Sequence, residues 1–262
     1  MTALKPTTVR FVPGEATSPD ELAIAALHLY AYETAAGLVG ARARVLDVGF
    51  GEGYGSQIFI ASGADYHGVE VDSEIVEHAR ACYGPYFETY DGTSIAAPDG
   101  SFDLVVAFQM IAYLDDPHPL LREIRRVLDP EGLALITTPN RAYRLFEGQR
   151  PWNRYHAREY LAGELEQVLR ATFGDVTVHG IYAAEPIDSI VRARADRARR
   201  LARLDPLGLR YRLPESLNAP LRRVVRRAAQ PAVDRSEFSL DRIGHDLGAA
   251  TDGLDLLAYV RH

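Results

Sequence analysis

The apolar positions of the chain fall into short uninterrupted runs, separated by stretches in which apolar residues recur at helical spacing. The runs predict buried strands at 45–50, 65–71, 85–90, 102–108, 133–138, 176–181 and 254–260. The intervening pattern predicts helices at 18–38, 53–61, 73–82, 119–128 and 157–171. Such alternation is typical of an α/β protein with a doubly wound, mostly parallel sheet, here of seven strands, and with helices on both faces.

The alternation breaks after residue 182, where an arginine-rich stretch with helical spacing begins. Residues 192–227 hold twelve arginines against three acidic residues, a net charge of +9, although the whole chain carries −7. This stretch is a solvated helical pair, a lid that recognises an anionic or lipid-linked ligand, or a surface for membrane or nucleic acid. The predicted organisation is a helical cap at 1–40, a core at 41–182, an Arg-rich helical insertion or lid at 183–240, and the last strand within 241–262.

Composition narrows the class of protein further. Of the 262 residues, 47% are hydrophobic and 25% charged, as in ordinary soluble enzymes. No stretch approaches the roughly 18 uninterrupted apolar residues of a membrane span, and the N-terminus lacks the layout of a secretory signal. The single cysteine, Cys82, excludes an internal disulfide and a cysteine zinc site, and His118 after two aspartates indicates a turn. We expect a cytoplasmic protein without a metal or an integral membrane segment; a homodimer stays open.

The segment VLDVGFGEGYG places glycines at 49, 51, 53 and 55, directly after the first predicted strand. At the carboxyl end of a parallel strand, such a turn lets a ligand lie against the main chain. The spacing departs from the dinucleotide fingerprint G-x-G-x-x-G, and the Lys-Ser/Thr pair of a P-loop is missing. Asp47 would repel a pyrophosphate but suits a ligand that carries an ammonium and a sulfonium group.

Three further predicted strand ends carry acidic or amide side chains. Glu70 can accept hydrogen bonds from both hydroxyls of a ribose. Asp91, followed by Gly92 in TYDGT, can accept one from an adenine amino group, and Gln109 faces the same crevice. Each of them alone could cap a helix or a turn, but their agreement favours one nucleoside site.

With these residues in place, the chain resembles the class I S-adenosylmethionine (SAM)-dependent methyltransferases. The similarity is carried by VLDVGFGEGYGS, GVEVD, YDGTSIAAPDGSFDLVVAFQMIAYLDDP and LREIRRVLDPEGLALITTPN, and it covers residues 45 to about 182. With RFVPGE at 10–15, it is most similar to members that modify small molecules and glycans. The resemblance implies a SAM site formed by Tyr30, Asp47, Gly49, Gly51, Gly53, Glu70, Asp91, Gly92 and Gln109, in which Tyr30 covers the carboxylate of SAM.

Methyl transfer from a sulfonium mainly requires alignment, and a base only where the acceptor is a hydroxyl or a protonated amine. His156, at the start of the helix predicted at 157–171, is the first candidate base; a capping or packing histidine is the alternative. Tyr113 stands where relatives often carry histidine, and it lies either near the acceptor or in the core. The chain has no Pro-Cys pair and no [DN]-P-P-[YF] motif after the fourth strand, which argues against methylation of DNA.

The resemblance, with His156 as the candidate base, implies an enzyme that uses SAM to methylate an oxygen of a sugar or secondary metabolite. Two alternatives stay open: an RNA methyltransferase that grips its substrate with the Arg-rich insertion, and a SAM-binding sensor or scaffold without catalysis. RNA is disfavoured because the remainder of the chain is acidic and repels a long polyanion.

Overall fold

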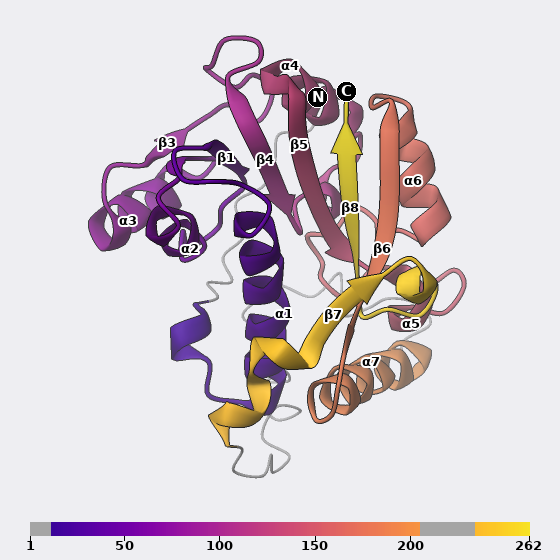
Figure 1. The fold of residues 1–262 in the computed structure, drawn as a ribbon. Coiled ribbons are helices and arrows are strands. Elements are labelled where there is room, and N and C mark those ends of the chain that lie inside the picture. Colours follow the sequence, from indigo (N-terminus) through magenta and orange to yellow (C-terminus); the bar gives the residue numbers. More distant parts are fainter. Residues whose placement is uncertain (1–11, 205–233) are drawn as a thin grey trace.

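A computed structural model of the protein describes residues 12–204 and 234–262 (Figure 1). The strands are β1 Arg44–Val48, β2 Asp65–Glu70, β3 Phe87–Thr89, β4 Phe102–Phe108, β5 Leu128–Pro139, β6 Asp175–Ala183, β7 Ile243–Asp246 and β8 Asp255–Arg261. The helices are α1 Pro19–Ala36, α2 Ser56–Ala61, α3 Ser73–Tyr83, α4 His118–Val127, α5 Arg141–Arg144, α6 Ala162–Arg170 and α7 Ile187–Leu204. Short 3₁₀ turns lie at Pro13–Glu15, Ile111–Tyr113, Arg235–Phe238, Leu240–Arg242 and Gly248–Ala250. Much of the predicted Arg-rich insertion, residues 205–233, lies outside the described residues.

The strands form one sheet in the order β3-β2-β1-β4-β5-β8-β6-β7. β1 pairs in parallel with β2 and β4, and β3 and β5 extend the parallel part on either side. β8 is antiparallel to both of its neighbours, β5 and β6, and β7 is antiparallel to β6. This confirms the doubly wound, mostly parallel sheet. The prediction of seven strands was wrong by one, because Ile243–Asp246 is too short and too polar to give an apolar run.

The sequence before α1 explains where this helix begins. Ser18 Oγ accepts a hydrogen bond from the backbone N–H of Glu21 (3.3 Å), and the Glu21 carboxylate accepts one from the backbone N–H of Ser18 (3.2 Å). This capping box, with Pro19 as the first helical residue, fixes where the helix begins. The helix expected at 157–171 begins only at Ala162, and the preceding Tyr160 pairs with Asn140 as an isolated bridge.

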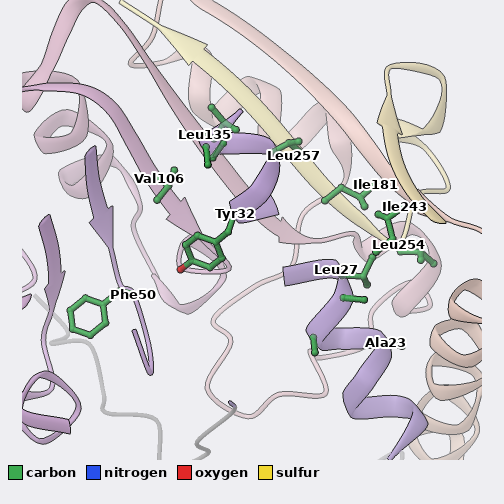
Figure 2. Close-up of a cluster of buried hydrophobic side chains, with 14 of the residues drawn as sticks. Ala23, Leu27, Tyr32, Phe50, Val106, Leu135, Ile181, Ile243, Leu254 and Leu257 are labelled. Carbon is green, nitrogen blue, oxygen red and sulfur yellow. The ribbon is translucent and has the colours of Figure 1, made fainter. Parts of the chain in front are cut away.

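Both faces of the sheet are buried. On one face, side chains of α1 such as Leu27 and Tyr32 turn towards sheet residues such as Val106 and Leu257 (Figure 2). On the other face, α4 and α6 pack against the sheet through residues such as Leu121, Ile124, Leu165 and Leu169. Burial on both sides explains why the parallel strands read as continuous apolar runs.

α1 also packs against α7, and Figure 1 shows both helices gathered where β4 and β5 end. α1 therefore covers the sheet where β4 and β5 end, and α7, the described part of the Arg-rich segment, packs beside α1. No helix in the described ranges is long and apolar enough to cross a membrane.

Candidate functional site

A cavity of ≈ 200 Å³ lies at the carboxyl ends of the parallel strands, where the strand order reverses between β1 and β4. Its wall includes four carboxylate residues, and none of the described residues that line it is a lysine or an arginine. The carboxylate residues are Glu52, Glu70, Asp72 and Asp255. A cavity lined in this way favours a ligand that carries positive charge.

The glycine turn after β1 forms one wall. Gly49 and Gly51 line the cavity with φ angles of 75° and 58°, in the left-handed region that favours glycine. A Cβ at Gly51 would meet nothing within 4 Å, so the main chain there is open to a ligand. Gly53 and Gly55 serve packing, since a Cβ at Gly53 would collide with side chains of α3 and β3, and one at Gly55 would lie 2.2 Å from the Tyr32 ring. The predicted contact of Gly53 with SAM stays a prediction.

Asp47 lies behind this wall and is buried, with 1% of its surface exposed. Its Oδ2 accepts hydrogen bonds from the hydroxyls of Tyr32 and Tyr66, both at 3.0 Å. Its Oδ1 is buried without a partner within the described part of the chain. Burial raises the pKa of Asp47 to about 7 against the two tyrosine hydrogen bonds, which lower it.

Glu70 and Gln109 line the cavity, and their contacts with SAM stay predictions. Glu70 ends β2, and its Oε1 accepts the backbone N–H of Val71 at 2.7 Å. Burial raises the pKa of Glu70, and hydrogen bonds from the backbone of Val71 and Gly51 oppose this. Gln109 follows β4 with a φ of 60°, which is uncommon for a residue other than glycine and tends to occur at functional sites.

Five predicted SAM ligands do not line the cavity: Asp47 and Gly53, described above, and Asp91, Gly92 and Tyr30. Asp91 is exposed, and its Oδ1 accepts the backbone N–H groups of its own turn at 2.8 Å; Gly92 belongs to the same turn. Tyr30 instead places its hydroxyl 2.7 Å from His245 Nδ1. The side of α1 that faces the cavity carries His28, which the sequence reasoning missed, because Tyr30 projects from a different side of the helix. The roles of Asp91, Gly92 and Tyr30 stay predictions.

The two candidate catalytic residues lie side by side, but only one of them lines the cavity. Tyr113 lines it, and its hydroxyl accepts a hydrogen bond from Asn153 Nδ2 at 3.2 Å. The His156 ring packs edge-to-face on Tyr113, with 4.8 Å between the ring centroids, and its Nδ1 lies 3.2 Å from Glu159 Oε1. Glu159 is buried and also pairs with Arg144 at 3.1 Å. His156 therefore belongs to a buried network behind Tyr113 and does not begin a helix, and its role as a base stays a prediction.

A further cavity residue, Asp255, was also missed. It is the first residue of β8, and its Oδ2 accepts a hydrogen bond from Gln109 Nε2 at 3.0 Å. The available signal was an acidic residue at the start of the apolar run DLLAYV. Because β8 is antiparallel, its start lies at the same edge of the sheet as the ends of the parallel strands.

This arrangement fits SAM. The unpartnered Oδ1 of Asp47 and the carboxylates of the cavity wall would stabilise an ammonium and a sulfonium group. The open main chain at Gly51 would accommodate the amino-acid part, and Glu70 would accept hydrogen bonds from the ribose hydroxyls. Apolar side chains such as Leu27, Ile75 and Met110 complete the wall.

Known proteins show the same combination of fold and sequence. Residues 46–136 match a family model described as a methyltransferase domain. The chain is 32% identical over 225 residues to a probable S-adenosylmethionine-dependent methyltransferase of Mycobacterium tuberculosis, an alignment covering 82% of this chain and 75% of that relative. It is 36% identical over 166 residues to a probable S-adenosylmethionine-dependent methyltransferase of Mycolicibacterium smegmatis, covering 59% of this chain and 64% of the relative.

Two solved structures share the fold. A SAM-dependent methyltransferase from Thermotoga maritima, described as a possible histamine N-methyltransferase, has a TM-score of 0.54 at 16% identity, with 89% of this chain and 88% of that chain covered. The [4+2]-cyclase SpnF has a TM-score of 0.57 at 21% identity, with 90% and 81% covered. At these identities the likeness concerns the fold alone. Together with the relatives in sequence, it establishes that the chain belongs to the class I SAM-dependent methyltransferases, with SAM as its methyl donor.

Proposed function

We propose that the enzyme methylates an oxygen of a small molecule, such as a sugar or a secondary metabolite. The observation that carries this proposal is the cavity itself, which holds ≈ 200 Å³ and has α1 as one of its walls through Leu27, His28, Ala31 and Tyr32. A concave site bounded in this way suits a small acceptor better than a folded polymer. The absence of lysine and arginine among the described lining residues disfavours a phosphate backbone.

The described arginines of the Arg-rich segment support the same choice. Arg192 pairs with Asp188 at 2.9 Å, and Arg197 pairs with Asp20 of α1 at 2.6 Å. Arg199 pairs with Asp196. Pairing within the protein leaves these side chains less available to RNA, which supports the interpretation of this segment as part of the cover over the strand ends. A non-catalytic sensor is not favoured, because the chain belongs to a family of enzymes.

The chemistry follows from the residues around the cavity. When bound, SAM supplies a methyl group already activated by its sulfonium. The protein's part is to exclude water, hold the acceptor in line and receive any proton that the acceptor loses. Phe108, Met110 and Ile181 give an apolar wall that excludes water, while Tyr113 and Thr137 offer hydroxyls that can orient a polar acceptor.

The experiment supplies the enzyme with SAM carrying a ¹³C- and radiolabelled methyl group in cell extract, followed by separation of small molecules, lipids and nucleic acids. We expect label in the small-molecule or lipid fraction and a methoxy carbon signal by NMR. Label confined to nucleic acid, or a methyl group on nitrogen or carbon, would overturn the proposal.

Two glycine variants form a matched pair for this experiment. Gly51→Leu places a side chain in the open space of the cavity and should weaken binding of the demethylated product, S-adenosylhomocysteine, about 100-fold or more, with loss of labelling. Gly148 also has a positive φ, 76°, and a Cβ added there would meet nothing within 4 Å, but it is exposed and does not line the cavity. Gly148→Leu therefore carries the same backbone strain and should keep both binding and labelling.

A further inference from the structure

Asp255 stands out among the groups that no assigned role explains. Its Cα is flanked by Pro139 of β5 and Ile181 of β6, so it lies where the sheet edge meets the cavity. It is buried, with 7% of its surface exposed, and it lines the cavity together with Tyr113 and Thr137. An acidic side chain in such a place is costly unless it is paired or used.

The carboxylate is held in place by Gln109. The Gln109 Nε2 donates to Asp255 Oδ2 at 3.0 Å and lies 3.4 Å from Thr137 Oγ1, while the Gln109 backbone N–H donates to the Thr137 carbonyl at 2.9 Å. With its φ of 60°, Gln109 is a strained residue fixed on three sides. Gln109 binds Oδ2, and Asp255 lines the cavity, so Oδ1 is the oxygen that Gln109 leaves for a ligand there.

Burial and neighbouring charges shift the pKa of Asp255. Burial raises the pKa of Asp255 to about 7; Arg144 and Arg194 oppose this, and Glu159 reinforces it. Burial raises the pKa of Tyr143 most, and the charge of Asp255 adds to that rise. A carboxyl group with a pKa near the working pH is suited to receive a proton during the reaction.

We infer that Asp255 is the catalytic group that takes the proton from the hydroxyl of the acceptor. As the acceptor oxygen forms its bond to the methyl carbon, the bond from that carbon to sulfur breaks, its electron pair stays on sulfur, and the hydroxyl proton moves to Asp255 Oδ1. This rests on the proposed function, since only an acceptor that loses a proton needs such a group.

The neighbouring candidates are less suited to this step. His156 does not line the cavity and shares its Nδ1 with Glu159. Burial raises the pKa of Tyr113, so its hydroxyl stays protonated and serves to orient the acceptor. Gln109 is a positioning residue for Asp255.

The test uses Asp255→Asn, which keeps the shape and an oxygen acceptor for Gln109. Asp175→Asn is the matched control, because Asp175 is the exposed first residue of β6 and lies 3.8 Å from Arg261. The substrate is the acceptor that the labelling experiment identifies. With it, D255N should lower kcat about 10²- to 10⁴-fold and abolish the rise of kcat around pH 7. D175N should resemble the wild type in both.

Two measurements do not depend on turnover. Calorimetry should give D255N an S-adenosylhomocysteine Kd within about threefold of the wild type. In protein labelled with ¹³C-aspartate, the wild type and D175N should show a carboxyl signal that titrates near pH 7 and is missing from D255N. If the asparagine variant does not fold, Asp255→Glu, which displaces the carboxylate, should lower kcat and keep S-adenosylhomocysteine binding.

A hydroxyl acceptor that D255N methylates at the wild-type rate would overturn the assignment of Asp255 and leave the proposed function standing. A signal of Asp255 that titrates near pH 4 would also overturn it. An acceptor methylated on nitrogen or carbon would overturn the proposed function, whatever Asp255 does.

Discussion

The buried carboxyl of Asp47 makes a quantitative prediction about stability. Its pKa is raised from 3.8 to about 7 by burial, so the folded protein binds this proton more tightly than the unfolded chain does. As pH rises from 4 towards 7, the unfolded chain releases the proton first, and the free energy of unfolding falls; above pH 7 the loss is complete. Between pH 5 and pH 8 the loss amounts to about 3 kcal/mol.

Asp47→Asn removes this proton and keeps an oxygen that can accept from both Tyr32 and Tyr66, which donate to the same oxygen in the wild type. Urea unfolding of the wild type and D47N at pH 5 and pH 8 gives the two differences in free energy. From pH 5 to pH 8, the free energy of unfolding of the wild type should fall by about 3 kcal/mol more than that of D47N. Contributions of groups that do not interact with Asp47 cancel in this comparison.

Asp103→Asn is the control, because the hydrogen bonds of Arg44 lower the pKa of Asp103. That carboxyl is ionised in both folded and unfolded chains from pH 5 to pH 8, and its stabilising effect is lost only at lower pH. The difference between the wild type and D103N should therefore stay constant. If the difference for D47N is as flat as that for D103N, Asp47 ionises normally and the argument from burial fails.

Two further variants test the cover and the wall of the cavity. Ser18→Ala removes the side chain that caps α1 and should lower the free energy of unfolding by about 1 kcal/mol in urea, while an unchanged midpoint would show that tertiary contacts alone hold this helix end. Gly55→Ala places a Cβ 2.2 Å from the Tyr32 ring and should cost about 1–3 kcal/mol, seen as a lower Tm; a Tm equal to that of the wild type would show that the ring can move aside.

Much of the fold could be predicted because parallel strands buried on both faces leave an unmistakable apolar pattern. The positions of the glycine turn and of the acidic residue that ends β2 could also be predicted, because the apolar pattern shows where β1 and β2 end. β7 could not be read, because Ile243–Asp246 offers a single large apolar side chain and pairs only at the sheet edge. Residues 205–233 lie outside the described residues, so that part of the predicted insertion stays a prediction.

The site was harder to predict where side-chain direction decides the outcome. Tyr30 and His28 are two residues apart on one helix, and spacing alone does not say which side faces the sheet end. Asp91 occurs at the expected strand end, but its own turn offers the backbone N–H groups that its carboxylate binds. His156 was predicted to lie at the start of a helix, but that helix begins six residues after it, at Ala162.

Asp47 and Asp255 show why a raised pKa does not identify a catalytic group by itself. Burial lifts both pKa values to about 7, yet the two carboxyl groups have different access to a ligand. Asp47 is sealed behind the glycine turn, with one oxygen fully used by two tyrosines, so it can act only through its charge. Asp255 shares one oxygen with Gln109 and lines the cavity, so it can exchange a proton with what is bound there. The same physical cause therefore produces a carboxyl group without access to the ligand on the β1 side of the site and a proton acceptor at the start of β8, and only the geometry tells the two apart.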